Sequence, residues 1–149
     1  MEKTQYNRII IGGGPAGFFA AITAAEANPD LSILILEKGK QVLRKVRISG
    51  GGRCNVTHAC YDPRELIGYY PRGGKELRGP FTRFGPTEMV EWFARRGVQL
   101  KAERDGRMFP ESNSSETIVN CLSGEAERLG ITVWMENAIT AVEKLATGF

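Results

Sequence analysis

Three glycines near the N-terminus have the spacing of a dinucleotide-binding turn. Gly12, Gly14 and Gly17 follow a short apolar run and lead directly into an alanine-rich run. The first glycine lets the chain turn, the second lets the backbone approach a pyrophosphate, and the third lets helix and strand pack closely. Pro15 falls near the first helical turn, where its missing N–H costs nothing. The pattern predicts a strand, a turn and a helix whose N-terminus faces a phosphate.

An acidic residue follows at the distance that such a site requires. Residues 31–36 form a second apolar run, which predicts a parallel strand buried on both faces. Glu37 closes this run, 20 residues after Gly17 (37 − 17). A carboxylate there can accept hydrogen bonds from a ribose diol, and its charge disfavours a 2′-phosphate. Strand, glycines, helix, strand and acid therefore occur in the order of a dinucleotide fold.

A second glycine-rich stretch, residues 49–55, has the sequence Ser-Gly-Gly-Gly-Arg-Cys-Asn. Successive glycines expose N–H groups and permit positive φ, so they can form an anion-binding concavity. Arg53 adds a forked donor, and Asn55 can both donate and accept. Cys54 can be interpreted as a thiol nucleophile whose pKa Arg53 lowers, or as a small packing residue. We favour packing, because no base or resolving cysteine lies nearby in sequence.

Residues 45–57, preceded by the glycine turn and Glu37, resemble the aminoacetone-oxidase-like family of FAD-dependent flavoproteins. These proteins are also described as NAD(FAD)-utilising dehydrogenases. Residues 106–110, Gly-Arg-Met-Phe-Pro, are similar to the family's Gly-Arg-x-Phe-Pro segment, so the resemblance spans most of the chain. It implies an FAD-dependent oxidoreductase whose flavin exchanges a hydride or electrons with a substrate. NAD(P)H is then the candidate electron donor.

The resemblance also implies which residues hold FAD. The glycine turn would hold the pyrophosphate, Glu37 the adenosine ribose, and backbone near Ile139 the adenine. Lys45 and the 49–55 loop would line the phosphate, ribityl and flavin-proximal side. Where the family usually carries Asn, this chain has His58, which we expect to be a solvated loop residue. The cofactor-binding candidates are Gly12, Gly14, Pro15, Ala16, Gly17, Glu37, Lys38, Lys45, Ser49, Gly50, Gly51, Gly52, Arg53, Cys54, Asn55 and Ile139.

The elements that position these residues predict one domain over residues 1–149. Its fold class is α/β, a Rossmann-like FAD/NAD(P)-binding domain with a parallel sheet, in which residues 60–112 form a helix and hairpin insertion. The elements expected in the insertion are a short helix from Asp62, a basic loop at 71–80, a helix from Pro86 ended by Gly97, and a hairpin with strands at 98–103 and 107–110.

The C-terminal part predicts the rest of the sheet. An N-capping cluster at residues 112–115 precedes a helical pattern that Gly130 ends. Residues 131–135 then predict a strand that completes a βαβ-type parallel sheet. Residues 138–144 predict a further strand.

Composition excludes several classes of protein. The chain has 149 residues, of which 42% are hydrophobic and 25% charged, as in an ordinary globular domain. A net charge of +3 does not by itself argue for nucleic acid. No run approaches the roughly 18 apolar residues of a membrane span. Three cysteines without C-x-x-C spacing predict free thiols in a reducing cytoplasm and no metal site.

Several alternatives stay open. The resembling proteins are much longer, which implies that this chain is the N-terminal part of a larger two-domain flavoprotein. The surface that a missing segment would cover then favours self-association. An NAD-binding dehydrogenase domain and a non-catalytic dinucleotide-binding module share the glycine turn. An RNA-modifying flavoprotein is a minor alternative, suggested by the Arg and Lys residues at 72–83. No catalytic acid or base is assigned, because no paired carboxylates or histidine-centred set is present.

Overall fold

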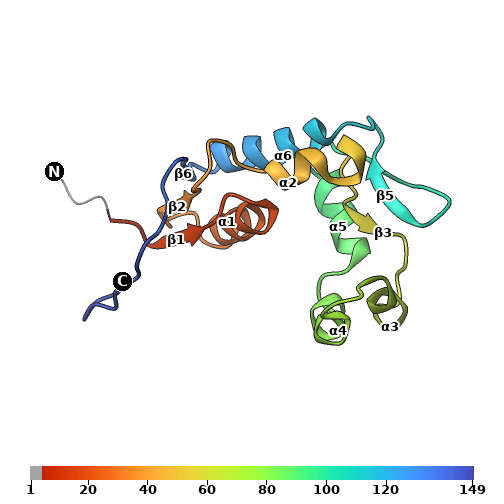
Figure 1. The fold of residues 1–149 in the computed structure, drawn as a ribbon, viewed down its shortest axis with the longest axis horizontal. Helices are drawn as coiled ribbons and strands as arrows, with labels where there is room; N and C mark the ends of the chain where they lie inside the picture. The colour runs from red at the N-terminus through yellow and green to blue at the C-terminus, as the bar shows by residue number, and fades with distance from the viewer. Residues whose placement is uncertain (1–4) are drawn as a thin grey trace. The chain divides into compact units, whose positions relative to one another are not determined.

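The computed structural model describes residues 5–149, which form two compact units (Figure 1). The first unit comprises residues 5–46 together with Leu122–Phe149. The second unit is Arg47–Cys121. Two helices, α2 (Arg44–Ile48) and α6 (Ser115–Arg128), carry the chain from one unit to the other.

A parallel sheet forms the centre of the first unit. Its strands are β1 (Arg8–Ile11), β2 (Ile33–Leu36) and β6 (Thr132–Trp134), in the order β1-β2-β6. In the register of the sheet, Ile35 of β2 lies opposite Ile10 on one side and Val133 on the other. All four residues of β2 are buried, as predicted for the central strand of a parallel sheet. The predicted Rossmann-like α/β fold with a parallel sheet is therefore confirmed.

Helix α1 (Pro15–Ala27) links β1 to β2. Pro15 occupies its first turn, as the sequence predicts, and Gly14 is its N-cap. The helix buries a stripe of side chains three and four residues apart, which is the spacing of one helical face. This stripe is Phe18, Ala21, Ile22 and Ala25.

Helix α6 starts at the predicted capping cluster. The hydroxyl of Ser114 accepts a hydrogen bond from the N–H of Glu116 at 3.3 Å. Gly130 follows the helix with φ +68°, a left-handed conformation that glycine adopts without strain. Buried Ile131 then leads into β6.

The second unit contains an antiparallel sheet. Its strands are β3 (Thr57–His58), β4 (Leu100–Ala102) and β5 (Arg107–Pro110), in the order β3-β5-β4. Strands β4 and β5 are the predicted hairpin, and Gly106 in its turn has φ +82°. Strand β3 was not predicted, because two residues are too short to show a periodicity.

Short helices complete the second unit. They are the 3₁₀ turn η1 (Ser49–Gly52), α3 (Pro63–Leu66), the 3₁₀ turn η2 (Ile67–Tyr69), α4 (Gly74–Phe81) and α5 (Pro86–Ala94). The predicted helix starts are confirmed: the Asp62 carboxylate accepts from the N–H of Arg64 at 2.8 Å, and Pro86 opens α5. Gly97, with φ +75°, follows the end of α5.

The prediction of a loop at residues 71–80 is wrong, since α4 occupies most of it. Gly73 precedes the helix in the left-handed conformation, with φ +71°. A Cβ on Gly74 would lie 2.6 Å from the carbonyl oxygen of Ile67, so glycine permits a close approach to η2 there. Pro80 lies in the last turn, where the lost N–H removes one hydrogen bond. Tertiary packing at Gly74 thus outweighs the loop-forming composition.

The prediction of a strand at residues 138–144 is also wrong. Residues 136–149 contain no regular strand, only an isolated bridge between Leu145 and Gly148. Every residue from Trp134 onward is exposed. A strand needs a partner for its N–H and C=O groups, and within residues 5–149 no strand pairs with this segment. Across the same described residues, no helix is both long and apolar enough to cross a bilayer.

Candidate dinucleotide-binding site

The glycine turn of the first unit has a separate physical constraint at each glycine. Gly12 has φ +107°, and its N–H donates to the carbonyl of Leu36 at 2.8 Å. A Cβ on Gly17 would lie 2.1 Å from the carbonyl oxygen of Gly12, which no substituent can tolerate. Gly14 is extended (φ −85°, ψ 177°), and a Cβ there would meet nothing within 4 Å. The fold itself therefore requires glycine at positions 12 and 17, whereas at position 14 it leaves open space.

The N-terminus of α1 is open to an anion. Gly14 has no side chain to cap the helix, and the first turn contains no acidic residue. The N–H groups of Ala16 and Gly17 lie in this first turn, where a helix provides no acceptor. Free N–H groups and the positive end of the helix dipole favour a phosphate at this position. These residues fit the pyrophosphate of a dinucleotide.

Glu37 is held beside this turn by the backbone. One carboxylate oxygen, Oε2, accepts from the N–H of Gly13 at 2.8 Å, and the other, Oε1, accepts from the N–H of Gly39 at 2.7 Å. The hydrogen bonds from Gly39 and then Gly13 lower the pKa of Glu37 below its ordinary value. A carboxylate has about four acceptor sites, so acceptor capacity remains for a ribose hydroxyl.

Gly13 is a residue of the turn that the spacing rule missed. A Cβ there would lie 2.7 Å from Cγ1 of Val42 and 3.0 Å from Cβ of Glu37. Its carbonyl accepts from the N–H of Leu43 at 2.7 Å, so both backbone groups of Gly13 are engaged. The available signal was the run of three consecutive glycines, of which Gly13 is the middle one.

The 49–55 loop lies in the second unit, where it forms η1 and the residues after it. Gly50, Gly51 and Gly52 have φ of +57°, +69° and +85°. A Cβ on Gly50 would lie 2.7 Å from Cε1 of Phe109 and 2.9 Å from the nitrogen of Asn55. The carbonyl of Ser49 accepts from the backbone N–H groups of Arg53 and Cys54. Glycine is therefore required for both the conformation and the packing of this loop.

The side chains of the loop are engaged within the second unit. Arg53 forms an ion pair with Glu103, and its guanidinium lies 4.0 Å from the centroid of the Phe109 ring. With its amide nitrogen oriented as the donor, Asn55 donates to the carbonyls of Thr57 at 2.9 Å and Met108 at 3.2 Å. Arg53 and Asn55, which were predicted as cofactor contacts, thus hold the 49–55 loop against β5 and against the turn between β4 and β5.

Cys54 fits the packing interpretation. Only 6% of the residue is exposed, and burial raises the pKa of its thiol, which opposes formation of the nucleophilic thiolate. Its φ is +64°.

The expectation that His58 is a solvated loop residue is wrong. It belongs to β3, and its ring stacks on that of Tyr69 with centroids 3.7 Å apart. Its Nε2 lies 3.0 Å from the carbonyl oxygen of Asp105. The sequence gives no signal of this contact, because 47 residues separate His58 from Asp105.

The predicted site residues fall into three groups. In the first unit, the glycine turn and Glu37 are in direct contact. In the second unit, the 49–55 loop packs on Phe109. The remaining three candidates make no such cluster: Lys38 is exposed after β2, Lys45 is exposed on α2, and Ile139 is 40% exposed in the C-terminal segment.

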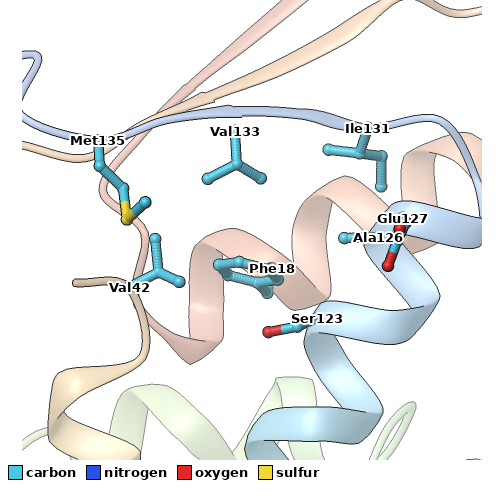
Figure 2. Close-up of a pocket in the computed structure, with 8 residues that line it drawn as sticks. All are labelled: Phe18, Val42, Ser123, Ala126, Glu127, Ile131, Val133 and Met135. Carbon is cyan, nitrogen blue, oxygen red and sulfur yellow. The ribbon is translucent and has the colours of Figure 1, made fainter.

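A separate cavity of about 290 Å³ lies in the first unit between α1, α6 and β6 (Figure 2). Most of its lining is apolar, and the polar side chains that reach it are those of Ser123 and Glu127. No residue of the glycine turn lines it. The lining residues are Phe18, Val42, Ser123, Ala126, Glu127, Ile131, Val133 and Met135.

The family described as HI0933-like protein Rossmann domain matches residues 6–149. The chain belongs to this family. It is 33% identical over 144 residues to the 3-dehydro-bile acid delta(4,6)-reductase of Clostridium scindens, covering 96% of this chain and 34% of that protein. It is 30% identical over 145 residues to the ribosomal RNA dihydrouridine synthase of Escherichia coli, covering 97% and 35%. The chain thus spans about a third of the length of these curated relatives.

Solved structures agree on the fold. The 3-ketosteroid-delta4-(5alpha)-dehydrogenase of Rhodococcus jostii superposes with a TM-score of 0.67 at 17% identity, covering 98% of this chain and 41% of that chain. The E. coli quinol fumarate reductase subunit FrdA superposes with a TM-score of 0.63 at 20% identity, covering 91% and 26%.

The predicted family and Rossmann-like fold class are confirmed. Curated relatives named as a reductase and as an electron transfer flavoprotein-ubiquinone oxidoreductase agree with the predicted flavoprotein oxidoreductase class and with FAD as its cofactor.

Proposed function

We propose that this chain is the FAD-binding part of a reductase that saturates a carbon–carbon double bond conjugated to a carbonyl. The observation that carries the proposal is the open N-terminus of α1 beside a carboxylate held by Gly13 and Gly39. Bound FAD would supply the hydride chemistry, with NAD(P)H as the electron donor.

The chain's own residues would bind and orient the cofactor. The N–H groups of Ala16 and Gly17 would donate to the pyrophosphate, and the open space at Gly14 would let the phosphates approach the backbone. Glu37 would accept from the ribose hydroxyls and exclude a 2′-phosphate by charge repulsion. The 49–55 loop, which Arg53 and Asn55 hold within the second unit, is a further set of candidate contacts for FAD.

The names of the relatives support the class of substrate. A delta(4,6)-reductase of a 3-dehydro bile acid saturates double bonds that are conjugated to a 3-carbonyl. A dihydrouridine synthase saturates the double bond of a uracil ring, which is conjugated to a ring carbonyl. Addition of a hydride to the carbon remote from the carbonyl, and of a proton to the adjacent carbon, would account for both reductions. We expect the same reaction class in the parent protein of this chain.

Cofactor retention tests the first half of the proposal. The purified chain is mixed with FAD or with NAD, passed through a desalting column and examined by absorbance. Flavin bands that elute with the protein support FAD binding, whereas retention of NAD alone would indicate an NAD-binding dehydrogenase domain. Flavin retention without reduction by NAD(P)H in a longer form of the protein would indicate a non-catalytic module.

Two further expectations belong to this proposal. Within residues 5–149, Cys54, Cys60 and Cys121 form no disulfide, which fits a reducing cytoplasm, where we expect the protein to act. Ile9 and Ile11 are 54% and 62% exposed on the edge strand β1, which supports self-association. Light scattering after size-exclusion chromatography measures that association.

Replacing Glu37 by Gln should weaken FAD binding. Gln has a single oxygen acceptor and no charge, so it cannot satisfy Gly13, Gly39 and a ribose together. Hydrogen bonds to charged groups stabilise by about 1.5–3 kcal/mol, so we expect the FAD dissociation constant to rise roughly tenfold or more. Titration followed by flavin fluorescence measures it. Glu111→Gln, at an exposed position, is the control, and equal affinities in the two variants would remove Glu37 from the site.

We expect the carboxylate of Glu37 to set a lower pH limit for FAD binding as well. The folded protein lowers the pKa of Glu37. The contribution of the ionised carboxylate to FAD binding is therefore present at neutral pH and is lost as the pH falls through that lowered pKa. FAD retention should therefore persist on mild acidification and fall only at strongly acidic pH. In Glu37→Gln, the part of this acid dependence that comes from Glu37 should disappear. A parallel decline in both proteins would contradict the prediction.

A further inference from the structure

Five cations of the second unit lie within or beside the short helical segments α3, η2 and α4. Segments α3, η2 and α4 contact one another. We call the five cations of this segment the basic surface, and all of them are exposed. They are Arg64, Arg72, Lys75, Arg78 and Arg83.

The basic surface is not neutralised by ion pairs. Within residues 5–149, none of its five cations is paired with a carboxylate, whereas three other arginines of the same unit are: Arg47 with Glu116, Arg53 with Glu103 and Arg107 with Asp105. Residues 60–83 contain these five cations and three acids, a net charge of +2 (5 − 3). One of the acids, Asp62, is engaged as the N-cap of α3.

A fixed aromatic ring lies on the same segment. Tyr69, in η2, stacks on His58 at 3.7 Å with an angle of 25° between the rings, yet 56% of Tyr69 remains exposed. His58 is held in turn, because its Nε2 lies 3.0 Å from the Asp105 carbonyl and its ring fills the space of a Cβ on Gly106. Tyr69 therefore has its ring stacked on His58, while more than half of the residue is exposed to solvent.

We propose that the basic surface and Tyr69 bind single-stranded RNA. A base would stack on the open face of Tyr69 and extend the His58–Tyr69 stack, while the unpaired cations would contact phosphates. Binding to a membrane surface would require exposed aliphatic residues. Binding to an acidic protein would not require an aromatic ring that is held in place like that of Tyr69. The inference rests on the proposed function, and it makes a uracil within RNA, rather than a free small molecule, the substrate of the reductase.

Binding of a fluorescently labelled, uridine-rich RNA of about ten nucleotides, a length within the range of single-strand sites, tests the inference. Fluorescence anisotropy of the 149-residue chain, loaded with FAD, is recorded at several salt concentrations. Wild-type binding should weaken steeply with salt. Tyr69→Ala should weaken binding about tenfold, and Tyr69→Phe should restore it, because the ring and not the hydroxyl stacks. The triple variant K75E/R78E/R83E should bind weakly and with a shallower salt dependence.

Controls separate this inference from the proposed function. Arg95→Glu, an exposed cation at the C-cap of α5, should bind RNA as the wild type does. Far-ultraviolet circular dichroism and flavin retention verify that each variant is folded. Wild-type RNA affinity in the Tyr69→Ala and triple variants, or no RNA binding by a chain that retains FAD, would overturn the inference and leave the proposed function standing. Equal affinity for DNA of the same sequence would overturn the choice of RNA. Loss of flavin retention in the wild type would instead contradict the proposed function.

Discussion

Gly17→Ala is expected to lose FAD binding and to destabilise the first unit. The added methyl would lie 2.1 Å from the carbonyl oxygen of Gly12 and 3.3 Å from Cγ2 of Ile10. The first neighbour is backbone, so the β1–α1 turn must open. Overpacking of this kind typically costs about 1–3 kcal/mol, and more where backbone must move. Urea unfolding and flavin titration measure the two effects.

Gly14→Ala is the matched variant that separates folding from cofactor binding. Its Cβ would meet nothing within 4 Å, and its backbone is extended, so the free energy of unfolding should change by less than about 0.5 kcal/mol. FAD affinity should nevertheless fall, because the methyl occupies the space through which a pyrophosphate approaches. Unchanged FAD affinity in Gly14→Ala would contradict our placement of the phosphates. Gly124→Ala on α6, also without a close neighbour, is the control for FAD affinity, which it should leave unchanged while it stabilises the helix by about 0.5–1 kcal/mol.

Phe109→Ala should have the largest effect on the second unit. The ring is fully buried, lies 4.0 Å from the Arg53 guanidinium carbon and packs against Gly50. Deleting a buried phenylalanine ring costs about 3–5 kcal/mol, a large part of the stability of an ordinary domain. We therefore expect a strong loss of stability and a mobile 49–55 loop. Urea unfolding measures the loss of stability, and proteolysis within the loop measures its mobility.

Phe149→Ala provides the control for the same chemical change. Phe149 is 83% exposed, so its removal should alter the free energy of unfolding by less than about 0.5 kcal/mol. Equal stability losses in Phe109→Ala and Phe149→Ala would show that burial of Phe109 is not what holds the loop.

The sequence was most informative where the fold depends on local pattern. Apolar runs flanked by glycines predicted β1 and β2, and the position of Glu37 predicted a carboxylate beside the turn. Its hydrogen bond with Gly13 joins residues 24 apart and was not predicted, because the spacing rule leaves Gly13 out. The hairpin of β4 and β5 followed from Asp105-Gly106, a pair that favours a tight turn.

The predictions failed where contacts between residues far apart in the sequence determine the structure. The pairing of Arg53 with Glu103 joins residues 50 apart, and composition offered no means to choose that partner over an anion. The stacking of His58 on Tyr69 depends on how β3 and η2 pack. Helix α4 forms because Gly74 permits close packing on Ile67, a tertiary effect that opposes local propensity.

The groups that would receive the phosphates at the start of α1 belong to the main chain, and this has an evolutionary consequence. Pro15 and Ala16 are exposed, so drift can change such side chains without removing a single donor. Selection then acts on geometry at two positions, a positive φ at Gly12 and a missing Cβ at Gly17. A site of this kind can persist while most of the surrounding sequence is replaced. A chain with the same fold at 17% identity illustrates how much of the sequence the fold itself leaves free.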